Sequence, residues 1–438
     1  MSGLASALPT DTPARQDWPL WQRNYTIGIL CLVGFFNYVD RQLLSILVEP
    51  VKAELQISDT AIGLLTGIAF SAFYVIAGIP LARLADRGNR RTLIAACLTV
   101  WSLATALCGF AQNYIHLALA RIGVAGGEAG SAPAIQSLII DLFPASRRAT
   151  MLGIFQAAMG VGIGAGYFLG GWLNTAFDWR TAFVVVSLPG VLLAVIMMLT
   201  VREPPRGLSD PDGDQKSHGE SHTLREVFAF ILGNIPLRFL VMIAVTSALA
   251  GYSILNWGPA YMMRSFGWTT MQVGSWMGPA TAFGLIFGNV AAGLIGDRIA
   301  KGDLVKYMLV AGFGTALAYP FIMIFALAPT PHLAIFGLFV GKMLMTSWLP
   351  PTLAVALTMS PPRMRAMVAA VIALCMSLIG AGFGPTIAGI VSDLLTPVYG
   401  PDGLRYSIAI MASLLLVCAA LCFVAARVCR TYVGGKKI

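Results

Sequence analysis

The chain has 438 residues, of which 57% are hydrophobic and only 11% are charged. An average soluble domain has about 45–50% apolar and about 25% charged residues, so this composition excludes an ordinary soluble protein and indicates an integral membrane protein. Lysine and arginine outnumber aspartate and glutamate by 29 to 20. Most of the basic residues stand in short segments between apolar stretches, so the excess indicates membrane topology and no nucleic-acid partner is expected.

The first 23 residues carry three prolines and several charges but no apolar core. A cleavable signal peptide needs such a core. Residues 1–23 are therefore expected to form a cytoplasmic tail, and the first apolar segment is expected to direct insertion.

Apolar segments of about 20 residues follow along nearly the whole chain, which is the length that an α-helix needs to cross a bilayer. A barrel of alternating strands of about ten residues is excluded. Charged and Pro/Gly-rich breaks predict an all-α protein with twelve membrane helices, six in each half, near residues 24–48, 59–82, 92–111, 114–140, 149–172, 180–201, 236–262, 271–296, 305–327, 333–356, 366–392 and 404–427.

The charges in the connecting segments predict an orientation for these helices. With the N-terminus inside, 22 basic residues fall on the cytoplasmic side and four fall outside. Under the positive-inside rule this bias predicts that both termini are cytoplasmic. We expect a multi-pass protein of the inner or plasma membrane.

The segment 202–226 holds ten charges and three prolines. Such a composition cannot bury a core. We expect a cytoplasmic linker at 202–235 between a six-helix bundle at 24–201 and a second at 236–427, with a basic tail at 428–438. His218 and His222 lie four residues apart in this linker, but no helix or thiol is expected beside them, so no metal site is predicted.

The two halves resemble each other. The segment 82–87, Ala-Arg-Leu-Ala-Asp-Arg, recurs as Gly-Leu-Ile-Gly-Asp-Arg at 293–298, an offset of 211 residues. The Pro, Arg and Ala of 144–149 recur at 361–366, an offset of 217 residues. Two parallel six-helix repeats predict an alternating-access architecture in which the halves rock about a site at the membrane midplane.

Residues 82–91 resemble the cytoplasmic loop signature of the major facilitator superfamily, in which a small residue and Leu-Ala-Asp-Arg precede a basic pair. The sequence departs from this signature at Ala82 and Asn89, where the family usually has glycine. The resemblance covers all twelve expected helices. It implies the major facilitator fold, with helices 1, 4, 7 and 10 around the cavity.

The candidate gating residues are Asp86 and Arg87, with their repeats Asp297 and Arg298. A carboxylate here can pair with an arginine at a neighbouring helix end, or accept hydrogen bonds from its N-terminal amides. Such contacts would latch the two halves together on the cytoplasmic side. A solvated loop would explain the arginines but not the repeated aspartate.

The run Arg-Ile-Gly-Val-Ala-Gly-Gly-Glu-Ala-Gly at 121–130 is similar to the spinster group of this superfamily. The same holds for Asp-Arg at 40–41, Trp-x-Pro at 257–259 and Glu-Pro-Pro-Arg-Gly at 203–207. Animal members of that group export sphingosine 1-phosphate or lysophospholipids. Related organic-anion symporters share parts of the pattern.

Five charged residues lie well inside expected membrane helices, namely Asp40, Arg41, Arg121, Glu128 and Lys342. A charge near the bilayer centre costs about 2.5–3.5 kcal/mol on insertion scales, so each must face a partner or a cavity, and a functional role is the default interpretation. A structural ion pair is the alternative. At about 1.5 Å per residue, all of them except Glu128 are expected in one layer.

The cluster carries three positive and two negative charges, which favours an anionic substrate. The fixed guanidinium fork suits phosphate or carboxylate, so Arg41 and Arg121 are the candidate anion ligands, assisted by Lys342. Asp40 and Glu128 can titrate and are the candidate proton-coupling residues.

The remaining substrate contacts are expected from amphipathic side chains that include Tyr38, Asn256 and Trp257, although each could equally pack between helices. The glycines at 123, 126 and 127 allow either close helix packing or room for a ligand, and close packing is favoured.

No nucleotide-binding loop, nucleophile triad or metal-ligand cluster appears, so neither a cofactor nor enzymatic activity is expected, and an ion gradient must supply the energy. The sequence predicts a secondary active transporter, proton-coupled and monomeric, that moves an anionic amphiphile such as a lysolipid or a sphingosine-phosphate-like molecule. A transporter of a small organic anion such as a sugar acid is the alternative. A receptor or enzyme on the same scaffold is a third hypothesis.

Overall fold

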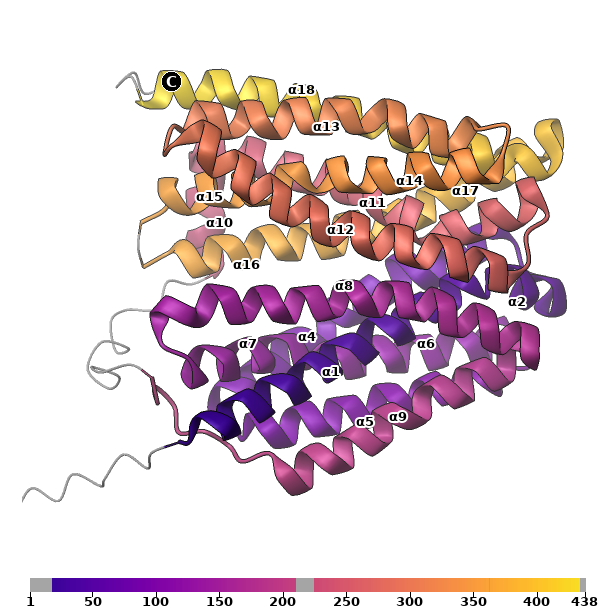
Figure 1. Ribbon diagram of the computed structural model, residues 1–438, viewed down its shortest axis with the longest axis horizontal. Coiled ribbons are helices and arrows are strands. Elements are labelled where there is room, and N and C mark those ends of the chain that lie inside the picture. The colour runs from indigo at the N-terminus through magenta and orange to yellow at the C-terminus, as the bar shows by residue number, and fades with distance from the viewer. Residues whose placement is uncertain (1–17, 210–223, 362, 434–438) are drawn as a thin grey trace, which may run out of the picture.

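The computed structural model describes residues 18–209, 224–361 and 363–433, and within these ranges the regular elements are all helical (Figure 1). The N-terminal half contains α1 (Leu20–Ile46), α2 (Val48–Leu55), α3 (Asp59–Leu64), the π-helix η1 (Leu65–Ala69), α4 (Phe70–Arg87), α5 (Arg90–Gly109), α6 (Tyr114–Glu128), α7 (Ser131–Leu142), α8 (Ala145–Ala176) and α9 (Trp179–Thr200).

The C-terminal half begins with the short helix α10 (Leu224–Gly233). It continues with α11 (Ile235–Phe266), α12 (Thr270–Ala300), α13 (Leu304–Leu327), α14 (Pro331–Met345), the 3-10 turn η2 (Thr346–Trp348), α15 (Leu349–Met359), α16 (Arg365–Cys375), the π-helix η3 (Met376–Ala381), α17 (Gly382–Tyr399), the 3-10 turn η4 (Gly400–Asp402) and α18 (Gly403–Val433).

Polar side chains begin several of these helices at the membrane edges. Asn89, Asn113 and Asp178 each accept a hydrogen bond from a backbone N–H in the first turn of α5, α6 and α9. Thr269 forms a reciprocal capping box with Gln272 at the start of α12. These caps satisfy N–H groups that the helix itself leaves unpaired, so the sequence marks where each membrane helix starts.

Ten segments in the described residues are long and apolar enough to cross a membrane. One of them, Arg365–Thr431, folds back at η4 so that α17 packs against α18. The helix expected at 114–140 is not among the ten because it is broken into α6 and α7, each shorter than a bilayer requires. The all-helical membrane fold is confirmed, and the number of twelve crossings stays a prediction.

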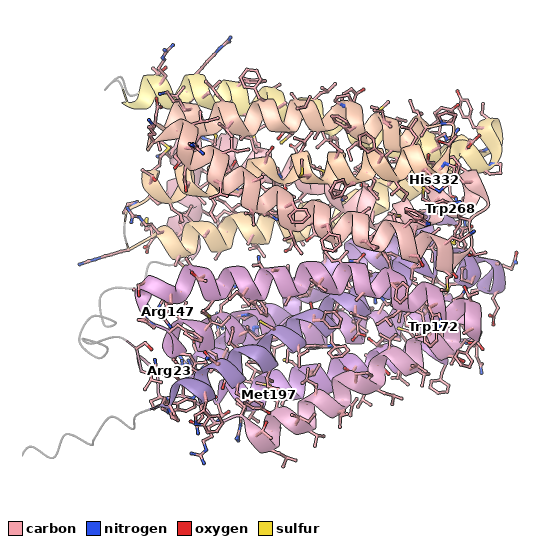
Figure 2. The ribbon with its side chains drawn as sticks, viewed as in Figure 1. Arg23, Arg147, Trp172, Met197, Trp268 and His332 are labelled. Atoms are coloured by element: carbon pink, nitrogen blue, oxygen red, sulfur yellow. The ribbon has the colours of Figure 1, made fainter. Side chains whose placement is uncertain are left out.

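The two halves lie side by side, with the N-terminal half below and the C-terminal half above in Figure 1. We call the end that holds the start of α1 and the end of α18 the inner end, after the predicted orientation, and the opposite end the outer end. Figure 2 shows Arg23 and Arg147 at the inner end, and Trp172, Trp268 and His332 towards the outer end.

Glycines allow the halves to touch backbone to backbone near the outer end. A Cβ on Gly171 of α8 would lie 2.2 Å from the carbonyl oxygen of Thr270, and a Cβ on Gly274 of α12 would lie 2.4 Å from that of Tyr167. A Cβ on Gly67 of η1 would likewise lie 2.2 Å from the carbonyl oxygen of Gly382. Any larger residue at these positions would separate the halves.

Several expected boundaries are corrected by the structure. The linker expected at 202–235 ends in the helix α10, whose Val227 and Ile231 are buried. The last helix, expected to end at 427, continues as α18 to Val433. The helix α2 was not predicted, and His218 and His222 lie outside the described residues.

Candidate functional site

Four of the five intramembrane charges gather in the N-terminal half. Asp40 and Glu128 are each 1% exposed and Arg121 is 3% exposed. Arg41 remains 21% exposed at its side chain, and its Nε lies 3.5 Å from Glu128 Oε2. Asp40 interacts electrostatically with Glu128 and Arg121. The structure therefore brings the two candidate proton carriers and the two candidate anion ligands into one buried group.

The two guanidinium groups of this cluster share one aromatic ring. Phe70, the first residue of α4, has Arg41 at 4.6 Å and Arg121 at 5.1 Å from its ring centroid. Tyr74, one turn further along α4, lies 5.5 Å from Arg41. Cation–π contacts stabilise a guanidinium without using its N–H donors, so both arginines keep donors free for an anion.

Several polar atoms of the cluster have no hydrogen-bond partner of good geometry in the described part of the chain: Asp40 Oδ1, Arg121 Nε and Nη1, and both carboxylate oxygens of Glu128. Trp101 and Asn37 are the polar neighbours of the Asp40 and Glu128 carboxylates. Buried polar groups are normally satisfied, so a concentration of unsatisfied groups needs an explanation. A substrate anion or exchanging protons would supply the missing partners.

The helix carrying Arg121 and Glu128 is interrupted directly after Glu128. Pro133 has no N–H to continue the helical ladder, and α6 gives way to α7 across Ala129 and Gly130. Gly127 lies so close to α5 that a Cβ there would be 2.6 Å from the backbone nitrogen of Trp101. This confirms close packing as the role of Gly127.

Lys342 is separate from the other four charges. It is 4% exposed on α14, and its Nζ donates to the carbonyl oxygen of Gly251 on α11 at 3.3 Å. In the described residues it has no acidic partner. Asp40, Arg41, Arg121 and Lys342 were expected in one layer from their depth along the helices. The structure instead places Lys342 in the C-terminal half, apart from the other three.

Tyr38 connects the charge cluster to a cavity. Its ring lies 5.8 Å from the Arg41 guanidinium, and it lines a cavity of about 420 Å³ between α1, α8, α12 and α15. Gln156 and Asn289 supply polar groups to this cavity, and Ile163, Leu285, Ile286, Val290 and Leu349 are among its apolar lining residues.

Asn256 and Trp257 are already engaged within the protein. Asn256 accepts a hydrogen bond from Ser45 of α1 at 3.1 Å and donates to the carbonyl oxygen of Tyr252. Trp257 is 1% exposed and donates to the carbonyl oxygen of Pro385 at 2.8 Å. In this conformation Asn256 joins the halves and Trp257 packs inside the C-terminal half, so the structure does not bring Trp257 to the charge cluster.

The candidate gating residues lie at the inner end and do not meet one another. Asp86, Arg87 and Arg298 are exposed, and the described chain gives Asp86 neither a hydrogen bond nor an ion pair. Asp297 accepts a hydrogen bond from Tyr307 in its own half at 2.7 Å. The expected latch between Asp86 and the other half is therefore not formed in this conformation.

A buried arginine that the sequence analysis missed organises the inner end of the N-terminal half. Arg90 is 0% exposed and pairs with Asp141 of α7 and, at 2.7 Å, with Glu203. Arg206 donates to the backbone of Ala85 at 2.8 Å. The first residues of the expected linker are thus fastened to the N-terminal bundle.

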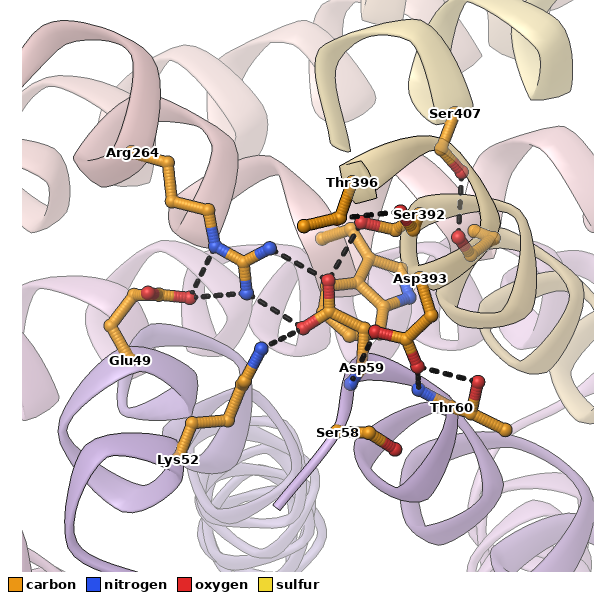
Figure 3. A network of polar contacts seen from close by, with 12 residues as sticks. Glu49, Lys52, Ser58, Asp59, Thr60, Arg264, Ser392, Asp393, Thr396 and Ser407 are labelled. Carbon is orange, nitrogen blue, oxygen red and sulfur yellow. Dashed lines mark hydrogen bonds and ion pairs between the residues drawn. The ribbon is translucent and has the colours of Figure 1, made fainter. Parts of the chain in front are cut away.

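The outer end carries a second network that sequence analysis missed, and this one joins the halves (Figure 3). Asp59 of α3 is 1% exposed and accepts two hydrogen bonds of 2.7 Å from Arg264 of α11. It also pairs with Lys52 of α2. Arg264 in turn pairs with Glu49 at 2.7 Å.

Asp393 of α17 completes this outer network. Its carboxylate accepts hydrogen bonds from the backbone N–H of Asp59 at 3.1 Å and from the N–H of Thr60 at 2.7 Å. Ser392 donates to Asp59 at 2.7 Å. An acid from one half therefore binds the helix start of the other, where the helix dipole favours negative charge.

Glu54 lies near the outer network but bonds only within its own half. Hydrogen bonds from Arg180 and Trp179 lower the pKa of the Glu54 carboxyl below its usual range.

Among the missed residues, Phe70 and Tyr74 had a usable signal, because aromatic residues four apart on a helix share a face. The outer network had none, since its members lie up to 344 positions apart, from Glu49 to Asp393.

Comparison with known proteins decides the family. Residues 30–385 match the family described as Major Facilitator Superfamily. The chain belongs to the major facilitator superfamily. It is a membrane transporter of that superfamily rather than an enzyme, and it resembles the spinster group.

Several relatives are similar over most of the chain. An MFS-type efflux pump of Mycolicibacterium smegmatis is 33% identical over 97% of this chain and 96% of its own length. Protein spinster homolog 1 of Homo sapiens is 29% identical over 89% of this chain and 77% of its own. A probable galactarate/D-glucarate transporter, GudP, of Bacillus subtilis is 30% identical over 68% of both chains.

One solved structure is closely similar. It is a bacterial homolog of the human lysosomal transporter spinster, in an inward-facing and unoccupied conformation. It superposes with a TM-score of 0.84 at 28% identity and covers 94% of this chain and 98% of its own.

Proposed function

We propose that this transporter is a proton-coupled secondary carrier of an anionic amphiphile, of the lysolipid or sphingosine-phosphate-like class. The observation that carries the proposal is the buried group of Asp40, Arg41, Arg121 and Glu128. Within the described residues this group makes one ion pair and leaves several donors and acceptors without a well-aligned partner. Intramembrane charges that are not satisfied by the protein are expected to serve a substrate or an ion pathway.

The amphiphile class is supported by what surrounds this group. Arg121 has two N–H donors without a partner in the described residues, and Arg41 beside it is 21% exposed and can turn its fork from Glu128 to a phosphate or carboxylate. Tyr38 leads from Arg41 to the cavity of about 420 Å³ between α8 and α12. A charged end joined to a mainly apolar cavity fits a headgroup with a hydrocarbon chain.

Proton coupling rests on the two carboxyl groups. In this proposal Asp40 or Glu128 binds a proton while the cavity faces one side and releases it when the cavity faces the other. Because Glu128 is paired with Arg41, an anion that recruits Arg41 would leave Glu128 free to take up a proton. Lys342, the cation of the C-terminal half, would contact the substrate when the halves approach each other.

A small organic anion such as a sugar acid is the alternative substrate. It is favoured by the similarity to the probable galactarate/D-glucarate transporter. It would use the same arginines but would leave the apolar part of the cavity without a function.

The test is flux through the purified protein in liposomes, with a short-chain fluorescent lysophospholipid and labelled glucarate offered separately and in competition. We expect lysophospholipid flux that responds to an imposed pH gradient. Added glucarate should not reduce this flux. Glucarate flux without lysophospholipid flux would establish the alternative. Arg121→Ala is the inactive control for either substrate, because it removes the anion ligand that both would use.

A further inference from the structure

Two mainly apolar hollows flank α13 where it approaches the inner end. The first has a volume of about 490 Å³ and lies between α12, α13 and α14. The second, of about 290 Å³, lies between α13 and α18. Leu309 of α13 lines both hollows. In Figure 1, α12 and α13 meet at the inner end and diverge outward, with α14 visible between them.

Three basic side chains stand at these hollows. Lys306 lines the first, and Arg427 and Arg430 line the second. All three are exposed, and none has an ion pair in the described part of the chain. The neighbouring acid, Asp303, accepts hydrogen bonds from two backbone N–H groups at the start of α13. Together with Asp303, the three basic residues therefore carry a net charge of plus two.

The walls of the first hollow face the bilayer. Ile295 and Phe313 line it and are 49% and 66% exposed. Its α12 wall runs from Gly288 to Ile299. These eleven steps span about 16 Å at about 1.5 Å per residue. That length corresponds to one leaflet, which is half of a hydrocarbon core about 30 Å thick.

We propose that this surface binds one anionic diacyl phospholipid from the leaflet at the inner end, which the positive-inside rule predicts to be cytoplasmic. The headgroup phosphate lies between Lys306, Arg427 and Arg430, and the acyl chains occupy the hollows on either side of α13. Basic pockets between membrane helices on the cytoplasmic side are typical headgroup sites, and the apolar hollows supply the hydrophobic contact. This site lies on the lipid-facing side of the C-terminal half and is independent of the substrate proposed above.

The test measures lipid binding to the purified, delipidated full chain by native mass spectrometry and by thermal shift. The probes are phosphatidylglycerol and phosphatidylcholine with identical acyl chains. We expect the parent to retain and be stabilised by phosphatidylglycerol more than by phosphatidylcholine. Arg427→Gln/Arg430→Gln should weaken phosphatidylglycerol binding about 30-fold, since each basic residue near anionic lipid contributes on the order of 1 kcal/mol.

The matched control is Arg83→Gln/Arg147→Gln, which removes two exposed inner-end arginines of the N-terminal half that line neither hollow. It should bind phosphatidylglycerol like the parent. Lys306→Gln alone should give an intermediate loss, and Val310→Phe, which narrows the first hollow, should weaken both lipids. The proposal is overturned if the parent shows no preference for the anionic lipid, or if both double variants lose it equally.

Discussion

The outer network and the buried charge cluster are both built from acids and arginines, yet their pairing is opposite. At the outer end, Asp59 is bound by Arg264, Lys52 and Ser392 together. In the cluster, Glu128 has one ion pair of 3.5 Å and Asn37 as a polar neighbour, and its oxygens make no hydrogen bond of good geometry in the described chain. The first set joins the two halves, and the second lies within one half.

This difference separates two tasks that charged groups perform in a transporter. A fully paired network between two bodies stabilises one relative position of those bodies, and it is lost when they move apart. A buried and incompletely paired group retains free donors and acceptors for a ligand or a proton. The pairing itself therefore distinguishes a contact that holds a conformation from a site prepared for binding.

The largest effect is expected from Arg121→Ala, which removes the least paired cation of the cluster. Substrate binding should weaken at least about 30-fold, because losing one partner of a buried charge contact costs about 2–5 kcal/mol. Arg121→Lys should recover little, since the planar fork is lost. Binding of substrate to the purified protein is the measurement. Parent-like binding by Arg121→Ala would remove this residue from the substrate site.

Neutralising the acids should separate coupling from binding. Asp40→Asn and Glu128→Gln should each bind substrate but lose the response of flux to an imposed pH gradient, because the group that carries the proton is absent. The measurement is flux in liposomes with and without the gradient. Glu54→Gln, an acid at the outer end and outside the cluster, should respond like the parent. If parent flux ignores the gradient, both carboxylates are structural partners of the arginines.

Breaking the outer network should change the conformation instead. Arg264→Ala removes the residue that ties Asp59 and Glu49 to the C-terminal half. A change of about 1–3 kcal/mol would shift the population of the open outer end 5- to 150-fold. Spin labels at Ala53 and Val398, exposed positions on α2 and α17, report the distance between the two halves at the outer end. The matched control is Arg180→Ala, whose ion pair with Glu54 lies within one half and should leave the distances unchanged.

At the inner end the expected effect is smaller in this conformation, because Asp86 makes no hydrogen bond or ion pair with the residues that the structure describes. Asp86→Asn should weaken a latch that forms only when the inner end closes, so the population should shift towards the inward-facing form. Labels at the inner ends of α7 and α15 would report longer distances. An unchanged distribution would exclude a latch through Asp86.

The smallest effect concerns Glu54. Its pKa is lowered in the folded protein by hydrogen bonds from Arg180 and Trp179. The stability that it contributes is therefore complete above the ordinary glutamate pKa of about 4.3 and is lost as pH falls through the lower folded value. Thermal unfolding of the parent and Glu54→Gln should differ near neutral pH and converge in acid. A difference that persists in acid would mean that the ionised carboxylate is not its source.

The sequence by itself determined the membrane class, the helical architecture and the family, because hydropathy length and local motifs are encoded within short stretches of chain. It also selected Asp40, Arg41, Arg121 and Glu128, since charges inside apolar helices stand out without any structure. Three of the four are almost fully buried, and all four lie in one group.

Only the tertiary structure decided which charges meet. Lys342 matched Asp40, Arg41 and Arg121 in predicted depth, yet it lies in the C-terminal half and bonds there to Gly251. Phe70 comes within reach of both Arg41 and Arg121 because the start of α4 lies close to α1 and α4 packs against α6. Asp59, Arg264 and Asp393 form the outer contact although 334 residues separate the first from the last. Depth along a helix follows from sequence position, but rotation about the helix axis and the approach of two halves depend on the packing of the whole bundle.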